Sequence, residues 1–316
     1  MSYVDVASPE NVTGFKVRAR KWFQLGGNWL YLIPALIFFI AYQAYPIIRV
    51  FVISFTDYHY LRQDPVRFVG FQNYINAFGD TLMYQGLLRA VYFTAIFLPT
   101  CIFIPLFLAI LLDRVKNQRL SAIYRLILLI PAVIPGPMIF IMWKWLYDFE
   151  IGPINRFLVD GLHLFTYRTA PQWLGNMPLA IPAIVAMEVW WGLGYHTIFF
   201  LAGLAAIPHD LFDAARVDGA NEWKMFWYVT LPRLRPIMLV LVVLRFGTAM
   251  AVIDEYLIMG GFNRALPTYT WTVYMWHLAF QLGDWFQGYA AAIGWIGAAA
   301  MIIVVAGLFY VFRNRD

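Results

Sequence analysis

The chain has 316 residues, of which 62% are hydrophobic and 13% are charged, and its formal net charge is +5. Soluble domains are closer to half apolar and a quarter charged, and here the excess comes as long unbroken apolar runs that a water-soluble fold could not cover. The positive charge invites a nucleic-acid partner, but its distribution along the chain fits membrane topology, so we expect no nucleic acid.

Six apolar runs are long enough to cross a membrane as helices, which takes roughly 20 residues. They cover residues 29–56, 88–112, 123–147, 179–205, 236–259 and 290–312. The fold class predicted is therefore all-α, a polytopic membrane protein with about six transmembrane helices. Residues 1–28 form a polar N-terminal tail and residues 29–316 the transmembrane domain. Because the first run is longer than a signal-peptide core, we expect it to be retained.

The basic residues predict the orientation, since Lys and Arg accumulate on the cytoplasmic side. With the N-terminus inside, the inner side carries most of them: Lys16, Arg18, Arg20, Lys21, Arg114, Lys116, Arg119, Arg125, Arg216, Lys224, Arg233, Arg235, Arg313 and Arg315. The outer side carries fewer: Arg62, Arg67, Arg89, Arg156, Arg168 and Arg264. Both termini are thus predicted to be cytoplasmic. The outer stretches 57–87, 148–178 and 260–289 are expected to hold short helices.

Ionisable side chains inside the spans are candidates for function, because each is costly to place in a membrane. Glu188 and Arg245 each lie about nine residues into their spans, or about 14 Å deep from opposite sides. We expect both to face the bundle interior and either to pair or to share a polar path. A purely structural ion pair remains an alternative.

Further solute-path candidates lie near these two charges. Trp190, Trp191 and Tyr195 follow Glu188, and aromatic rings stack on sugar faces; plain packing explains them equally. Asp254 and Glu255 lie near the outer end of the fifth span, and adjacent helix positions point about 100° apart, so only one is expected to face a cavity.

Prolines are expected to interrupt the second and third spans, which suits either rocking or kinked helices. They are Pro99, Pro105, Pro131, Pro135 and Pro137. The single cysteine, Cys101, allows no disulfide within the chain.

The loop 206–235 on the predicted inner side reads as two short helices joined at Gly219. Pro208 suits a first helical turn, and Leu211, Phe212, Ala215 and Val217 form an apolar stripe at helical spacing. A second, aromatic helix is expected from about 220 to 229, with Pro232 and Pro236 marking the start of the next span. By composition alone, an interfacial amphipathic helix that touches lipid is an alternative.

The spacing of Asp213-Ala214-Ala215, Gly219, Val229 and Leu231-Pro232 resembles the EAA loop of binding-protein-dependent ABC importer permeases. The chain departs from that pattern at Asp213, where the family usually has Glu, and at Val229, where it usually has Ile. The resemblance implies the type I ABC importer permease fold, with a coupling helix that sits in a groove of the ATPase subunit. The docking residues it implies are Asp213, Ala214, Ala215, Asp218 and Gly219.

Three shorter segments resemble the carbohydrate-type permeases of that family, which include maltose and glycerol-phosphate permeases. They are Phe68–Tyr74, then Arg125–Pro131 with Trp145, Gly152 and Asn155, and Ile253-Asp254 followed by Gly260-Gly261. The last is about a residue shorter than the family pattern and lacks its proline. These resemblances imply an ATP-driven importer of a sugar, oligosaccharide or polyol in a bacterial or archaeal plasma (inner) membrane.

The chain has no Gly-rich phosphate loop and no GxSxG, HExxH or CxxC motif, and His196 has no second ligand at metal-binding spacing. We therefore expect no catalytic residues, no metal and no cofactor on this chain, with ATP and Mg²⁺ on a partner. The resemblance implies a second permease, a different but similar chain, two ATPase subunits and an external or periplasmic binding protein. The alternatives are a permease for another polar solute, such as glycerol phosphate or a polyamine, and a standalone membrane protein.

Overall fold

The structure is a computed structural model that describes residues 31–62, 64–281 and 286–313, and within these ranges it consists of helices and loops with one isolated bridge, between Thr56 and Phe68. The predicted tail 1–28, with Lys16, Arg18, Arg20 and Lys21, lies outside the described residues, as does Arg315.

Four helices are long and apolar enough to cross a membrane: Tyr31–Ile53, Thr81–Asp113, Met177–Ala205 and Gln287–Tyr310. Two bent pairs also qualify, Gln118–Val133 with Gly136–Leu146, bent by 93°, and Glu222–Met250 with Asp254–Gly260, bent by 42°. Counting each bent pair as one span gives six, so the predicted fold class agrees with the described structure.

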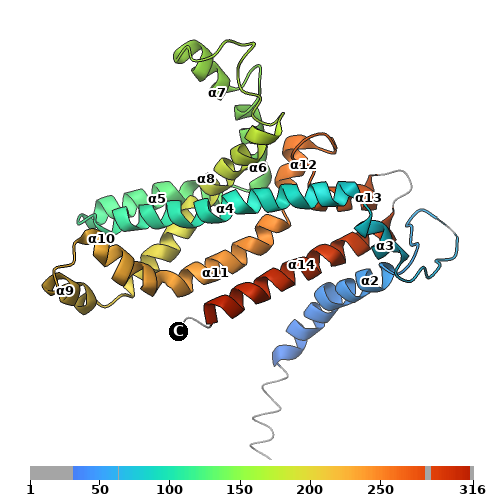
Figure 1. Cartoon of the computed structure of the whole chain (residues 1–316), viewed down its shortest axis with the longest axis horizontal. Coiled ribbons are helices and arrows are strands. Elements are labelled where there is room, and N and C mark those ends of the chain that lie inside the picture. The colour runs from blue at the N-terminus through green and yellow to red at the C-terminus, as the bar shows by residue number, and fades with distance from the viewer. Residues whose placement is uncertain (1–30, 63, 282–285, 314–316) are drawn as a thin grey trace, which may run out of the picture.

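The helices follow the predicted runs with shifted ends (Figure 1). The longer ones are α2 (Tyr45–Ile53), α4 (Thr81–Asp113), α5 (Gln118–Val133), α6 (Gly136–Leu146), α8 (Met177–Ala205), α11 (Leu231–Met250) and α14 (Gln287–Arg313). The shorter ones are α3 (Gln72–Phe78), α7 (Pro153–Arg156), α9 (His209–Val217), α10 (Glu222–Met225), α12 (Asp254–Gly260) and α13 (Trp271–Phe280). Three π-helical turns join them: η1 (Ile40–Ala44), η2 (Phe157–Gly161) and η3 (Phe226–Thr230).

Helices α4 and α8 form the centre of the bundle, with α5 packed on α8 and α11 on both. Their contact is filled by large buried side chains, among them Phe93, Ile184, Met187 and Leu241. At Gly194, the backbone of α8 approaches that of α5 so closely that an added Cβ would lie 2.2 Å from the Leu128 carbonyl oxygen. The glycine therefore permits this contact.

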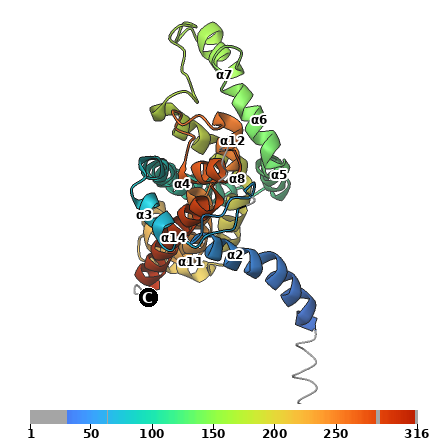
Figure 2. The ribbon, with the colours of Figure 1, turned by 90° about the vertical axis from the view of Figure 1, so that its right-hand side faces the viewer.

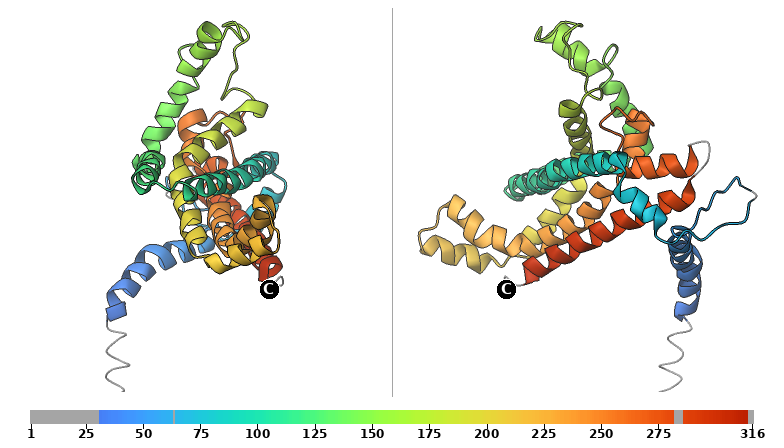
Figure 3. Two further views of the ribbon diagram at one scale, coloured as in Figure 1. Left: turned by 90° about the vertical axis from the view of Figure 1, so that its left-hand side faces the viewer. Right: turned by 45° about the vertical axis from the view of Figure 1, so that its right-hand side comes forward.

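The two ends of the bundle carry different elements. Helices α9 and α10 lie at one end, and α3 and α13 lie at the other (Figures 1 and 3). The segment Tyr31–Ile53 leads away from the bundle (Figure 2), and its apolar window is entirely unburied within the chain. Many large apolar side chains on other helices are also exposed, including Ile130, Val133, Ile141, Ile302 and Ile303. Such a surface suits lipid or a second membrane subunit and not water.

The proline prediction is correct for one span and wrong for the other. Pro135 and Pro137 lie at the break between α5 and α6, whereas Pro131 lies inside α5 without interrupting it. Pro99 and Pro105 lie inside an uninterrupted α4 of 33 residues. Helix α4 packs on α8, α11 and α13, and these neighbours hold it straight through the positions that lack an N–H.

The predicted separation between the aromatic helix and the fifth span is also wrong. Helix α10 continues through η3 into α11, so one helical segment runs from Glu222 to Met250. In η3 the Leu231 N–H bonds to the Phe226 carbonyl. This wider turn precedes Pro232, and the backbone thereby continues past a residue with no donor.

Short helices occur in all three predicted outer stretches, as α3, α7 with η2, and α13. Asp80 ties this end together: its Oδ2 accepts hydrogen bonds from Tyr274 (2.6 Å) and Tyr289 (2.7 Å), and its Oδ1 caps α4. Burial works against ionisation of Asp80, but these hydrogen bonds outweigh it and lower the pKa of the carboxyl below its ordinary value. An ionised Asp80 thus joins α4, α13 and α14.

Candidate functional site

One face of α8 lines a cavity of about 250 Å³ inside the bundle. The face consists of Glu188, Trp191, Gly192, Tyr195 and His196, which follow the spacing i, i+3, i+4, i+7, i+8 of a single helical stripe. Phe97 of α4, Ala132 of α5 and Arg245 of α11 complete the wall. Glu188, Trp191, Tyr195 and Arg245 were all predicted from the sequence to lie on a solute path, and the fold brings them together.

A second cavity, of about 440 Å³, adjoins the first and shares Phe97, Glu188, Trp191 and Arg245 with it. Its other walls come from the end of α11 and the start of α12, where the helix axis bends. Asp254 and Glu255 both line this cavity. The expectation that only one would do so is wrong, because both belong to the first turn of α12, directly at the bend.

Arg245 is held by aromatic and imidazole groups of α8. Its Nε donates to Nε2 of His196 at 2.7 Å, and its guanidinium carbon lies 5.8 Å from the centre of the Tyr195 ring. Because Nε2 accepts this hydrogen bond, the imidazole is neutral with its proton on Nδ1. The His196 side chain is 1% exposed, and its Nδ1 has no partner within the described chain.

The hypothesis that Glu188 and Arg245 share a polar path agrees with their common cavity, but they form no ion pair among the described residues. Instead, the buried carboxyl group of Glu188 lies within hydrogen-bonding distance of the Glu255 carboxyl group, a contact that requires a proton between the two. Glu188 is close enough to Glu255 and Arg245 to interact electrostatically with both.

Trp190 does not reach the cavity. It is two residues from Glu188, which on a helix places it on the opposite face, and it packs edge-on against Trp143 with ring centres 5.5 Å apart. Trp191 does line both cavities, but its indole N–H also donates to the Ile134 carbonyl at 3.2 Å. This bond satisfies a carbonyl at the break between α5 and α6, so Trp191 has a structural role as well.

Sequence reasoning missed His196 and Phe97 as parts of this site. His196 was considered only as a metal ligand, although its distance of eight residues from Glu188 places it on the same helical stripe. No sequence signal marked Phe97, because it comes from another helix. Within the described ranges no three His, Cys, Asp or Glu side chains gather as a metal site would require.

The predicted docking residues lie together at the other end of the bundle, in residues 206–230, which we call the α9–α10 segment. Helix α9 holds Asp213, Ala214 and Ala215, and Asp218 ends it. Gly219 has φ +76°, which confirms the expected glycine turn, since this conformation is costly for a side chain. Asp213 accepts a bond from Arg216 at 2.9 Å and is exposed.

The apolar stripe of α9 is shorter than predicted. Leu211, Phe212 and Ala215 are half-buried, whereas Val217 is 88% exposed. Val217 belongs to the last turn before Asp218 and Gly219, where the chain turns away.

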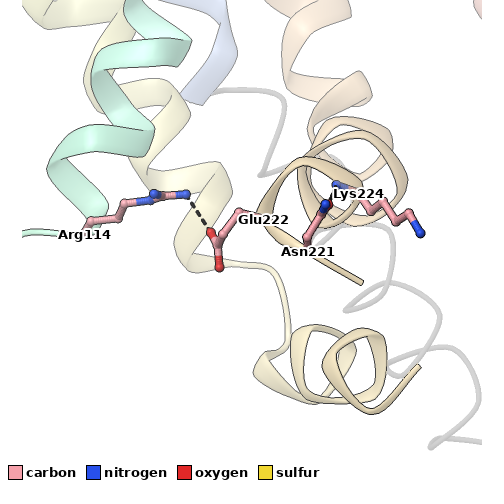
Figure 4. A network of polar contacts seen from close by, with 4 residues as sticks. All are labelled: Arg114, Asn221, Glu222 and Lys224. Atoms are coloured by element: carbon pink, nitrogen blue, oxygen red, sulfur yellow. Dashed lines mark hydrogen bonds and ion pairs between the residues drawn. The ribbon is translucent and has the colours of Figure 1, made fainter. Parts of the chain in front are cut away.

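The α9–α10 segment is tied to α4 by one ion pair, shown in Figure 4. Arg114, directly after α4, contacts Glu222 at 2.7 Å, and both side chains are mostly exposed. Asn221 caps α10 by accepting from the Lys224 N–H. The ion pair thus connects the start of α10 with the end of α4.

The amino-acid sequence matches a family of known proteins. The family described as binding-protein-dependent transport system inner membrane component matches residues 83–315. The permease protein SmoG of a sulfoquinovosyl glycerol transport system in Agrobacterium fabrum is 29% identical over 303 residues, covering 95% of each chain. The lactose transport system permease LacF of Rhizobium radiobacter is 28% identical over 302 residues, covering 94% of this chain and 97% of that protein.

Among solved structures, a chain of a bacterial ABC transporter that imports the acidic polysaccharide alginate has a similar fold. The TM-score is 0.79 at 21% identity, and the match covers 94% of this chain and 99% of that chain.

Proposed function

The chain belongs to the family of binding-protein-dependent transport system inner membrane components, and from that premise we propose that its solute is a sugar, oligosaccharide or polyol. It is a membrane-spanning permease subunit of an ABC importer and has the fold of such permeases. The solute reaches it from an external binding protein, in keeping with the family.

The observation that carries this proposal is the cavity between α4, α8 and α11. Its walls offer carboxyl oxygens, guanidinium N–H groups and aromatic rings within a bundle of apolar helices. Such a set suits a polar solute with many hydroxyls, because the rings pack on the carbon skeleton and the polar groups replace water. The relatives are named for transport of sulfoquinovosyl glycerol and of lactose, and this supports a sugar-type solute here.

ATP is handled by a separate subunit in this proposal. The α9–α10 segment would face the cytoplasm and dock on an ATPase through Asp213, Ala214, Ala215, Asp218 and Gly219. Its exposed helix, ending at a glycine turn, supports that role. We propose two ATPase subunits carrying ATP and Mg²⁺, a second, similar permease chain, and both termini of this chain in the cytoplasm of a bacterial or archaeal cell.

Co-purification tests the proposal. The tagged chain is isolated from its native membranes in mild detergent, and its partners are identified by mass spectrometry. We expect an ATPase with a phosphate loop and a second permease. Isolation of the chain alone, across several gentle detergents, would favour a standalone membrane protein.

Two variants of Gly219 test whether the glycine turn is part of the docking site. Nothing lies within 4 Å of a Cβ at this position, so a side chain meets only the cost of its positive φ. Asn tolerates that conformation and Val does not. Gly219→Val is expected to lose the ATPase and Gly219→Asn to keep it, whereas equal retention by both would exclude the turn from docking.

A further inference from the structure

We propose that Trp271 and Thr272, the first two residues of α13, are positioning residues for the solute path, because they bind carbonyl groups at the break between α11 and α12 and so fix the wall of the larger cavity. Neither side chain lines that cavity, so both act through the backbone that they bind. The inference rests on the proposed function only in taking the cavity as part of the solute path.

The break supplies most of the residues in the wall of the larger cavity. They lie at positions 247–249 and 251–255, on both sides of the 42° bend between Met250 and Asp254. Asp254 and Glu255 begin α12, so the direction of this short helix decides where their carboxyl groups lie. It also decides whether Glu255 meets the carboxyl group of Glu188 on α8.

Two backbone carbonyl groups at the break bind side chains of α13. A helix end leaves its last carbonyl groups without partners inside the helix, and in a membrane such groups need partners within the protein. Nε1 of Trp271 donates to the Met250 carbonyl at 2.8 Å, and the Thr272 hydroxyl donates to the Val252 carbonyl. The two bonds therefore stabilise the bent form of the fifth span.

Thr270 completes a short chain of hydroxyl groups at this point. Its Oγ1 lies 3.0 Å from Oγ1 of Thr272, and both side chains are buried. Because Thr272 uses its one hydroxyl proton on Val252, Thr270 must be the donor to Thr272. A serine at position 272 could keep both bonds, whereas a valine of similar shape could keep neither.

The start of α13 is itself closely packed between α4 and α14. A Cβ added at Gly86 of α4 would lie 2.4 Å from the Trp271 amide nitrogen. One added at Gly297 of α14 would lie 2.2 Å from the Trp271 ring. These two glycines allow α4 and α14 to pack directly against Trp271. The break is thus bonded to a residue that two long helices hold in place.

The proposal can be tested on the full chain purified in mild detergent, without knowing its solute. Cys101→Ala removes the one native thiol, and Asp254→Cys carries a nitroxide spin label at an exposed position of the cavity wall. The electron paramagnetic resonance spectrum gives the ratio of mobile to immobile label. The melting temperature of each variant is measured beside it.

Thr272→Val should raise this ratio about fivefold, the factor by which a typical hydrogen bond shifts an equilibrium. Thr272→Ser should return it to the wild-type value. Trp271→Phe, which keeps an aromatic ring but loses the bond to Met250, should also raise it and provides the test if Thr272→Val does not fold. Lys144→Met removes a bond to the Ile258 carbonyl at the other end of α12 and should act less, because Lys144 is exposed and water can replace it.

Thr94→Val is the matched control. Thr94 is also buried, but its hydroxyl binds the Ala90 carbonyl within its own helix, so the ratio at position 254 should stay unchanged even if the melting temperature falls. An unchanged ratio in both Thr272→Val and Trp271→Phe would overturn the proposal. A rise that Thr272→Ser does not reverse, or that Thr94→Val reproduces, would also overturn it. None of these outcomes depends on an ATPase, so they are distinguishable from failure of the proposed function, which co-purification decides.

Discussion

In the bundle around the cavity, the polar side chains come from helices far apart in the chain, whereas in the α9–α10 segment they come mostly from neighbours in sequence. Arg245 meets His196 across 49 residues inside the bundle, while Asp213 meets Arg216 within one turn at the surface. The first arrangement requires the packed bundle, and the second requires only a helix and a glycine turn.

The two regions therefore differ in the interactions that stabilise them. Inside the bundle, close backbone packing and buried hydrogen bonds fix each group, so single changes should be costly. In the α9–α10 segment, solvent screens the charges and few contacts are buried, so the same kind of change should be mild. The following predictions test that difference, starting with the largest effect.

Gly194→Ala should destabilise the protein by about 3 kcal/mol, the upper end of overpacking effects, because the new Cβ would meet the backbone of α5. Thermal unfolding of the purified chain, followed by tryptophan fluorescence, measures this. Gly307→Ala is the matched control, since nothing lies within 4 Å of a Cβ there; it should be neutral or slightly stabilising. Similar melting temperatures for the two variants would show that α5 and α8 do not pack so closely.

His196→Leu should cost about 2 kcal/mol, because it removes the acceptor of a hydrogen bond from a charged group and leaves Arg245 only its contact with the Tyr195 ring. His196→Gln can present an oxygen near the position of Nε2 and should recover most of the loss. Thermal unfolding of the purified protein measures both variants. Equal melting temperatures for Leu and Gln would show that the hydrogen bond to Arg245 does not stabilise the bundle.

Asp80→Asn should cost about 1.5 kcal/mol at neutral pH, the lower end of the range for hydrogen bonds to a charged group. It keeps an oxygen to cap α4 but loses the charge that accepts from Tyr274 and Tyr289. Since the pKa of Asp80 is lowered in the folded state, its stabilisation is present above its ordinary pKa of 3.8 and is lost as pH falls through the lower folded value. The gap in melting temperature between wild type and Asp80→Asn should therefore close under strongly acidic conditions. A gap that is the same at every pH would show that the charge is not involved.

The Arg114–Glu222 pair should contribute only about 0.5 kcal/mol, because both side chains are exposed. A double-mutant cycle with Arg114→Gln and Glu222→Gln, measured by thermal unfolding at low and high salt, isolates this coupling. Salt should remove most of it. A coupling above about 2 kcal/mol would show that contacts of the α9–α10 segment stabilise the protein as strongly as those inside the bundle, which would contradict the proposed difference.

The sequence predicted the parts of this protein that depend on local pattern. Long apolar runs marked the spans, because a membrane admits little else, and the glycine turn after α9 was visible because Gly219 follows a short amphipathic helix. The same reasoning failed at Pro99 and Pro105 in α4 and at Pro131 in α5, which lie inside helices and do not interrupt them.

Candidate residues of the cavity were predicted one by one, from their cost in a membrane or their chemistry, and most of them line it. Trp190 was wrongly predicted to line the cavity from its closeness in sequence to Glu188, whereas the lining residues form one stripe of α8. His196 was missed as part of this site for the same reason.

By itself, the sequence determined that the chain is helical, spans a membrane and carries an exposed helix that ends at a glycine, since each follows from composition and spacing within a short segment. Only the tertiary structure decided that Arg245 bonds to His196 and not to Glu188, that the Glu188 carboxyl group meets that of Glu255, and that Asp254 and Glu255 share one cavity. These outcomes depend on how α8, α11 and α12 pack and bend, and contacts between distant segments leave no periodic trace in the sequence.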